Sequence, residues 1–150
     1  MLDSKDRSIL RMLQVDARLS LTTVAKQLGL ATSTIHERVR KMEARGDVLG
    51  FYTWINPRAV GLNILAFIQV LVVGVENEVP FIKLITRLPE VEACYDLTGE
   101  WSYLLKVRTR DIEALSKFRR DHINPAAGVA RTNTSIAMTH FKETRTLNLE

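Results

Sequence analysis

A short helix, a glycine turn and a second helix within residues 20–45 constrain the fold of this chain more than any other feature. Ser20 is suited to cap a helix over Leu21–Leu28, where apolar residues follow the i, i+3, i+4, i+7 spacing. Gly29 can adopt the left-handed conformation that ends such a helix. Residues 32–45 then predict another helix, with an apolar stripe of Ile35, Val39 and Met42. We therefore expect a helix-turn-helix unit.

Patterns on either side of this unit extend the first domain. Asp3–Gln14 predicts a preceding helix, because Asp3 can cap it and apolar residues recur at helical spacing. Val48–Ile55 is rich in β-branched and aromatic residues and is closed by Asn56-Pro57, which predicts a strand. A hinge through Gly61 follows, so the first domain is expected to span residues 1–61.

The remaining residues, 62–150, predict a second domain with strands and helices in the order βαββαβ. The expected strands are Ile64–Val73, Val91–Thr98, Tyr103–Arg108 and Arg131–Phe141, and the expected helices are Val79–Leu88 and Asp111–His122. This order is that of a ferredoxin-like sandwich, so the fold class is α+β. Both helices would cover one sheet face, and several strands are apolar on both faces. We therefore expect the open face to be buried against another subunit, the alternative being a monomer with an unusually apolar sheet.

The outward side of the second helix of the helix-turn-helix unit is polar and basic, which is typical of a helix that reads double-stranded DNA. Hydroxyl groups near its start are short enough to reach base edges, whereas arginine and lysine can neutralise phosphates or bind guanine. The candidate DNA-binding residues are Ser20, Thr32, Ser33, Thr34, His36, Glu37, Arg38, Arg40 and Lys41. The alternative for Arg38 is an internal ion pair with Asp6 or a neighbouring helix, because such pairs are common.

Composition narrows the setting of the protein without deciding its function. The net charge of +4 is compatible with a polyanionic partner. Cys94 is the single cysteine, which excludes an intramolecular disulfide and favours a reducing cytoplasm. Cys94 itself is expected to fill space as a strand residue. The longest apolar stretch, Leu62–Val75, is too short to cross a bilayer of about 30 Å, so no membrane partner is expected.

Sequence motifs of the common enzyme classes are absent. The chain has no H-E-x-x-H, G-x-S-x-G or P-loop motif and no dinucleotide-binding glycine fingerprint. His122 and His140 have no cysteine or carboxylate at metal-ligand spacing. We expect no catalytic residues, no metal site and no cofactor. A ligand-binding oligomeric module, or a ferredoxin-like enzyme without a role at DNA, is the alternative.

Motifs along nearly the whole chain resemble those of the Lrp/AsnC transcription regulators, the leucine- and asparagine-responsive "feast/famine" proteins. The similarity covers residues 2–61 and continues through TGEWSYLLKV and GVARTNTSIAMTHFKETR. It rests on a combination of matches: Leu2-Asp3, Asp6, Asp16, Arg18, Ser20, Ala25, Gly29-Leu30, Arg38-Val39, Glu43, Gly99 and Tyr103-Leu104-Leu105. The resemblance implies a winged helix-turn-helix, a hinge strand and a ligand-sensing domain. It also implies homodimers that assemble further into tetramers, octamers or larger discs.

The same resemblance implies a site for a small effector, usually an amino acid, at the contact between dimers. The corresponding residues here are Gly99, Glu100, Trp101, Ser102, Tyr103, Thr132 and Thr134. Trp101 is alternatively a packing residue between dimers, because large aromatic side chains are enriched at interfaces. Two departures from the family matter. Ser102 replaces a common acidic residue that could pair with an ammonium group, and Ala31 replaces a common capping serine, for which Thr32 is the alternative cap.

Overall fold

The computed structural model describes all 150 residues and divides into two compact units. One unit comprises Met1–Trp54 together with Lys142–Glu150, and the other comprises Ile55–Phe141. The expected boundary after Gly61 therefore lies earlier, because the short 3₁₀ helix Pro57–Val60 belongs to the second unit. The C-terminal residues join the first unit, which the sequence patterns did not predict.

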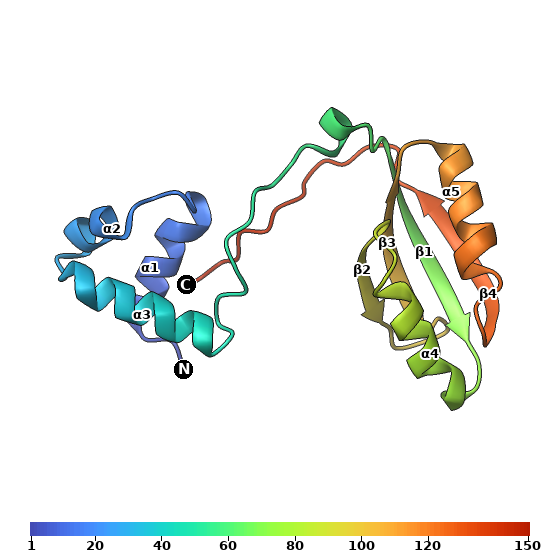
Figure 1. Cartoon of the computed structure of the whole chain (residues 1–150), viewed down its shortest axis with the longest axis horizontal. Helices are drawn as coiled ribbons and strands as arrows, with labels where there is room; N and C mark the ends of the chain where they lie inside the picture. The colour runs from blue at the N-terminus through green and yellow to red at the C-terminus, as the bar shows by residue number, and fades with distance from the viewer. The chain divides into compact units, whose positions relative to one another are not determined.

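Three helices build the first unit: α1 (Ser4–Val15), α2 (Leu21–Leu28) and α3 (Thr32–Ala44) (Figure 1). Their apolar stripes meet in one core, in which the predicted stripe of α3 is buried. The core residues are Ile9, Leu13, Val24, Ala25, Ile35, Val39 and Met42. The predicted helix-turn-helix is confirmed, and the burial of this stripe leaves the opposite side of α3 free for a ligand.

Local hydrogen bonds fix where these helices begin and end. The Asp3 carboxylate accepts from the backbone N–H of Asp6, and the Asp6 carboxylate accepts from that of Asp3, which forms a capping box at α1. Ser20 caps α2 by accepting from the N–H of Thr23 at 3.1 Å. Gly29 ends α2 in the left-handed conformation, with φ of 63°, so the chain can reverse into α3 within a short turn.

The segment 48–55, predicted as a strand, forms no strand within this chain. Most of its large side chains are exposed, including Leu49, Tyr52 and Trp54. A strand requires a hydrogen-bonded partner, and a single chain offers none to this segment. Its apolar composition is thus left facing solvent in the isolated chain.

The second unit consists of β1 (Ile64–Val72), α4 (Val75–Ile85), β2 (Val91–Asp96), β3 (Tyr103–Thr109), α5 (Ile112–Phe118) and β4 (Val129–Ile136). The antiparallel sheet has the strand order β2-β3-β1-β4, which confirms the predicted ferredoxin-like arrangement. The first and last residues of several helices and strands differ from those expected from the sequence.

These shifts have local causes. Helix α4 begins earlier than expected because Glu76 and Glu78 favour a helix N-terminus ahead of Pro80. After α5 the chain widens into a π-helical turn, Arg119–Ile123, instead of continuing as an α-helix. Strand β4 ends at Ile136, well before the expected Phe141, because its register pairs Ile136 with Ala66 near the start of β1.

The helices cover one face of the sheet, and that face forms the core of the second unit. Alternate residues of β1, such as Ile68 and Val70, are fully buried there against α4 and α5. The intervening residues of β1, including Phe67 and Gln69, are half-buried and lie on the open face. The open face carries both polar and apolar side chains: the Asn133 amide donates to the Gln69 side chain, and Phe67 lies on the same face of β1.

Candidate functional site

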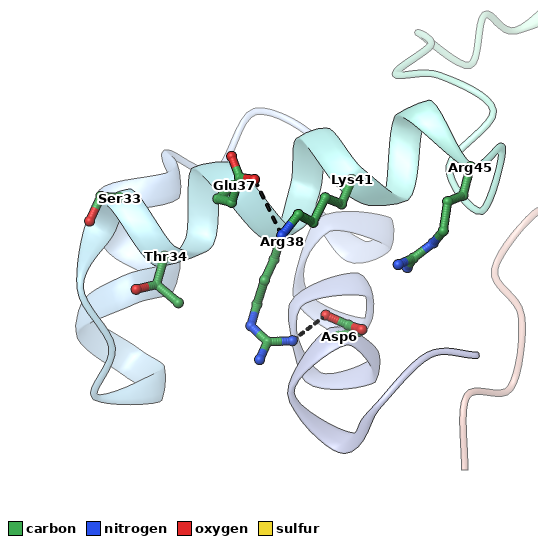
Figure 2. Close-up of a pocket in the computed structure, with 7 residues that line it drawn as sticks. All are labelled: Asp6, Ser33, Thr34, Glu37, Arg38, Lys41 and Arg45. Atoms are coloured by element: carbon green, nitrogen blue, oxygen red, sulfur yellow. Dashed lines mark hydrogen bonds and ion pairs between the residues drawn. The ribbon is translucent and has the colours of Figure 1, made fainter.

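The solvent side of α3 carries the polar residues that the sequence singled out. Five of these residues are exposed to solvent: Ser33, Thr34, His36, Arg40 and Lys41. A groove of about 470 Å³ runs along one flank of α3 and is lined by Asp6, Ser33, Thr34, Glu37, Arg38, Lys41 and Arg45 (Figure 2). A second groove of about 500 Å³ is lined by Leu21, Ser33, His36, Glu37, Val39, Arg40 and Glu43. Ser33 and Glu37 line both grooves.

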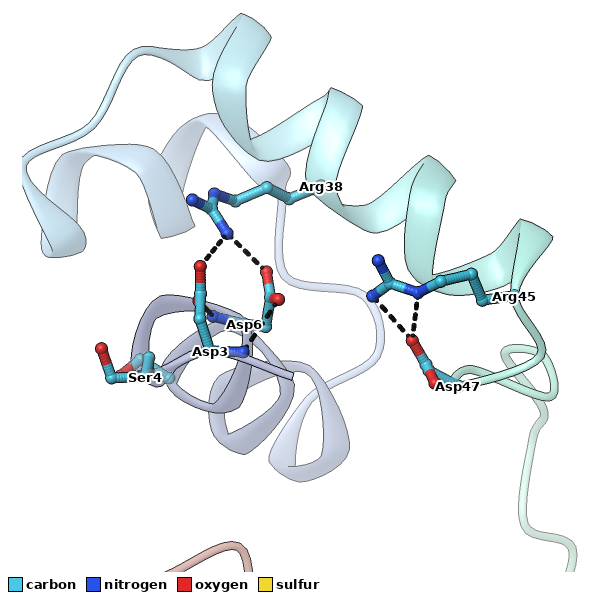
Figure 3. A network of polar contacts seen from close by, with 7 residues as sticks. Asp3, Ser4, Asp6, Arg38, Arg45 and Asp47 are labelled. Atoms are coloured by element: carbon cyan, nitrogen blue, oxygen red, sulfur yellow. Dashed lines mark hydrogen bonds and ion pairs between the residues drawn. The ribbon is translucent and has the colours of Figure 1, made fainter. Parts of the chain in front are cut away.

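Arg38 has a different role from the one expected of a DNA-contacting residue. Its Nη1 atom donates to the carboxylates of Asp3 and Asp6, both at 2.7 Å (Figure 3). Asp6 is buried, and the Arg38 side chain is only 28% exposed. The internal alternative is therefore the one that the structure shows, and Arg38 fastens α3 to the start of α1.

Glu37 holds two of the predicted phosphate-binding cations. Its carboxylate lies 3.1 Å from Arg40 Nη2 and 3.3 Å from Lys41 Nζ. The hydrogen bond from Lys41, together with the charge of Arg40, lowers the pKa of Glu37. Arg40 and Lys41 nevertheless stay 76% and 63% exposed, so both can exchange this exposed carboxylate for a phosphate.

The start of α3 lacks a side-chain cap. Ala31 occupies the N-cap position and Thr32 is the first helical residue, so Thr32 does not replace the missing serine. Thr32 therefore has no capping role that would compete with a contact outside the chain. By contrast, Ser20 caps α2 and also bonds the Thr23 hydroxyl at 2.8 Å, so its oxygen already has structural partners.

The loop before β3 is anchored to strand β4 through Arg131. This guanidinium pairs with the Glu100 carboxylate and lies over the Trp101 ring, 4.6 Å from the ring centroid. Arg131 is paired with Leu71 in the sheet register, which places it on the open face. Two of the predicted effector residues are thus brought together on that side of β4.

Thr132 and Thr134 lie on the other face of the same strand. Their register partners are Val70 and Ile68, which belong to the helix-covered core. Arg119 donates to the Thr132 hydroxyl at 3.4 Å, whereas the buried Arg119 Nε and Thr134 Oγ1 atoms have no hydrogen-bond partner. Within one chain, these threonines therefore lie on the face of β4 opposite to Arg131 and its loop partner Glu100.

Two predicted effector residues serve the structure of the domain. Tyr103 is 7% exposed and its ring stacks on Phe81, with centroids 5.1 Å apart. Burial raises the pKa of its hydroxyl, and its ring belongs to the core of the second unit. Ser102 accepts from the N–H of Val72 at 3.1 Å and donates to the carbonyl of Val72 at 3.2 Å, which ties the loop to β1.

Sequence reasoning missed Arg131, Arg119 and Arg45. Strand alternation places Arg131 on the face of its strand opposite to Thr132 and Thr134. Only the register with β1 shows that this is the open face of the sheet. Arg45 lines the groove beside α3 and pairs with Asp47 at 2.7 Å. None of the helices combines the length and hydrophobicity needed to cross a bilayer, and no group of three or more potential metal ligands gathers in the structure.

Comparisons with known families assign both units. Residues 2–43 match the AsnC-type helix-turn-helix domain, and residues 65–147 match the Lrp/AsnC ligand binding domain. The chain belongs to the Lrp/AsnC family. These matches confirm the predicted resemblance and the predicted fold class.

Lrp/AsnC relatives are similar over the full length of this chain. The HTH-type transcriptional regulator FL11 of Pyrococcus furiosus is 37% identical over 97% of this chain and 95% of its own. The transcriptional activator DecR of Escherichia coli is 30% identical over all of both chains. The Neisseria meningitidis regulator NMB0573, solved with L-Met, superposes with a TM-score of 0.92 at 31% identity, covering 99% of this chain and 97% of that one. This Lrp/AsnC protein is accordingly a transcription regulator that binds DNA through a helix-turn-helix.

Proposed function

We propose that α3 is the recognition helix of this Lrp/AsnC regulator and that its exposed side enters the major groove. The observation that carries the proposal is the division of α3 into a buried stripe and a hydroxyl- and cation-bearing outer side. Ser33 and Thr34 are placed to read base edges, and Arg40 and Lys41 to contact phosphates. Arg38 contributes by holding α3 in position.

The regulator is proposed to act as a homodimer that assembles into tetramers, octamers or larger assemblies. The support is the half-buried open sheet face, which includes Phe67 and Leu104, and the apolar segment 48–55. Exposed and half-buried apolar side chains in these two regions favour burial between subunits. A dimer presents two recognition helices, so its target should be symmetric.

DNA selected by this protein from a random pool is expected to contain an imperfect palindrome. Its half-sites should lie about one helical turn, roughly 10 base pairs, apart, or at a multiple of that spacing. The reason is that the two recognition helices of a dimer enter the major groove on the same side of the duplex. Sequencing the DNA that co-purifies with the protein provides the same readout from cells. Recovery of unrelated sequences without repeated half-sites would contradict the proposed recognition.

The second domain is proposed to bind an amino acid or a related metabolite near the loop 97–102 and strand β4. Support comes from the matched ligand binding domain and from the relative solved with L-Met. Thr134 lies on the helix-covered face, whereas Glu100 pairs with Arg131 of the open face, so we expect groups from a neighbouring subunit to complete the site. Arg131 supplies a cation beside the loop, and Arg119 Nε and Thr134 Oγ1 supply unpaired polar atoms on the other side.

A thermal-shift screen against the twenty amino acids tests this effector site. A ligand at 100 times its Kd should stabilise the folded protein by about 2.7 kcal/mol and raise the melting temperature. Arg131→Ala should abolish the shift, because the variant removes the anchor of Glu100 and Trp101. Arg110→Ala is the matched control, since it removes an exposed arginine that pairs with Asp111 instead of with the loop and should keep the ligand shift. A flat response of wild-type protein to every compound would contradict the site.

A further inference from the structure

The C-terminal segment Lys142–Glu150, here called the tail, docks on helix α1. Gln14 Nε2 donates to the carbonyl of Leu147 at 2.9 Å, and Gln14 Oε1 accepts from the N–H of the same residue at 3.1 Å. Arg11 Nη2 donates to the carbonyl of Leu149 at 2.7 Å, and Arg7 Nη1 donates to that of Glu150 at 3.4 Å. Figure 1 shows the C-terminus beside the helices of the first unit.

The three contacting side chains form one stripe of α1. Arg7, Arg11 and Gln14 are spaced i, i+4 and i+7, which places them within an arc of roughly 60° on an α-helix. Ile9 and Leu13 on the other side of α1 are buried in the core of the helical unit. The stripe is therefore a surface of its own, and occupying it leaves the core packing of α1 unchanged.

The chemistry of this surface recognises an extended backbone. All four bonds go to main-chain groups of the tail, and none goes to a tail side chain. The paired bonds of Gln14 to Leu147 reproduce the donor and acceptor that a neighbouring β-strand would offer. These bonds fix the register of the tail along α1.

The docked tail also changes how the helical unit is attached. The chain passes between the two units at residues 54–55 and again at residues 141–142. With the tail released, only the first passage would join the helical unit to the ligand binding domain. With the tail docked, both passages do, so the helical unit is connected at two points.

We propose that the tail is an intrachain latch, which clasps the Arg7, Arg11 and Gln14 stripe and limits the rotation of the DNA-binding unit about the segment 48–55. A chain held at two points has fewer orientations than one held at a single point, so less entropy is lost when two units meet paired half-sites.

Hydrogen exchange of the full-length protein tests the latch without any DNA. In the Arg11→Ala/Gln14→Ala variant, the amide of Leu147 should exchange at least about fivefold faster than in wild type, because its acceptor is removed. Alanine preserves α1, since it is the strongest helix former. Arg18→Ala removes an exposed arginine that has no bond to the tail and should leave the exchange unchanged.

Two exchange results would overturn the proposal. Equal exchange of the tail in wild type and in the double variant would show that the tail is not docked on this stripe. Protection that disappears when the protein is diluted into single subunits would place the tail on a second copy of the chain. Protection that persists on dilution and is lost in the double variant supports the latch.

A DNA readout tests the consequence for the helical unit and rests on the proposed binding to paired half-sites. The double variant should bind a two-half-site duplex about fivefold more weakly than wild type, with unchanged affinity for a single half-site. Equal loss on both duplexes would mean that Arg11 contacts DNA directly, which overturns this consequence. The exchange result remains interpretable if the DNA proposal itself fails.

Discussion

Arg38→Ala is expected to lower the free energy of unfolding of the helical unit by about 2 kcal/mol, because it leaves a buried carboxylate without its cation. Asp6 is 6% exposed, and Arg38 is the cation that bonds it, at 2.7 Å. The same guanidinium also bonds Asp3 at the start of α1. Hydrogen exchange of α1 and α3 amides in increasing urea measures this loss separately from that of the sheet domain.

Two variants on the same helix control this experiment. Arg40→Ala removes a cation whose pair with Glu37 is exposed, so it should change stability by less than about 0.5 kcal/mol. Arg38→Lys keeps a charge near Asp6 but loses the planar guanidinium and should have an intermediate effect. Equal costs for Arg38→Ala and Arg40→Ala would contradict the structural role of Arg38. The salt dependence of DNA binding should stay unchanged in Arg38→Ala, because Arg38 is assigned no phosphate contact.

The contribution of this network depends on pH in a defined direction. The hydrogen bond from the backbone N–H of Asp6, followed by that from Arg38, holds the pKa of Asp3 below its ordinary value of 3.8. A carboxylate with a depressed folded pKa stabilises the protein fully above its unfolded pKa and loses this effect as the pH falls through the folded value. The stability difference between wild type and Arg38→Ala should therefore narrow below about pH 4.

Local patterns predicted most of the fold because its elements are encoded by nearby residues. Ser20, Gly29 and the stripe of Ile35, Val39 and Met42 specify α2, the turn and α3 within a short window. The sequence offered Asp6 as an alternative partner of Arg38 but did not decide between that ion pair and a DNA contact, since the carboxylate lies 32 residues earlier in the chain. The tail was missed because its bonds are made by the backbone, which leaves no signature in side-chain periodicity.

The effector region shows a second limit of sequence reasoning. Thr132 and Thr134 share one face of β4 by simple alternation, and Arg131 takes the other. Alternation does not say which of these faces meets the helices, and that depends on the pairing of Thr132 with Val70. Tyr103 could not be separated from the loop by pattern alone, because its burial follows from its contact with Phe81 in α4.

The Arg40→Ala/Lys41→Ala variant is expected to bind every DNA sequence at least about tenfold more weakly than wild type, because two charged contacts to the duplex are lost. It should also flatten the salt dependence. Each phosphate contact contributes about 0.9 to the slope of log K against log salt, so the slope should fall in magnitude by about 2. Mobility-shift titrations from low to physiological salt, on specific and unrelated duplexes, measure both quantities.

The second domain offers a matched control for the loss of charge. Lys117 and Arg120 both pair with Asp121, at 2.6 and 3.9 Å, and are 70% and 69% exposed, much like the Glu37 cluster. Lys117→Ala/Arg120→Ala removes two positive charges, as the α3 double variant does, from a similar cluster of two cations and one carboxylate outside the helical unit. Its salt slope should match that of wild type. A slope that falls equally in both double variants would show that overall charge, and not the outer side of α3, sets the binding.

Glu37→Gln completes this test because it separates two roles of the carboxylate. If Glu37 only restrains Arg40 and Lys41, its neutralisation frees both cations and should tighten binding severalfold on all sequences. If Glu37 accepts a hydrogen bond from a cytosine amino group, the loss should instead fall at one base pair, with about 1–3 kcal/mol less discrimination. We expect uniform tightening, because the two cations already occupy the Glu37 carboxylate. A loss confined to one base pair would return Glu37 to the base-reading residues.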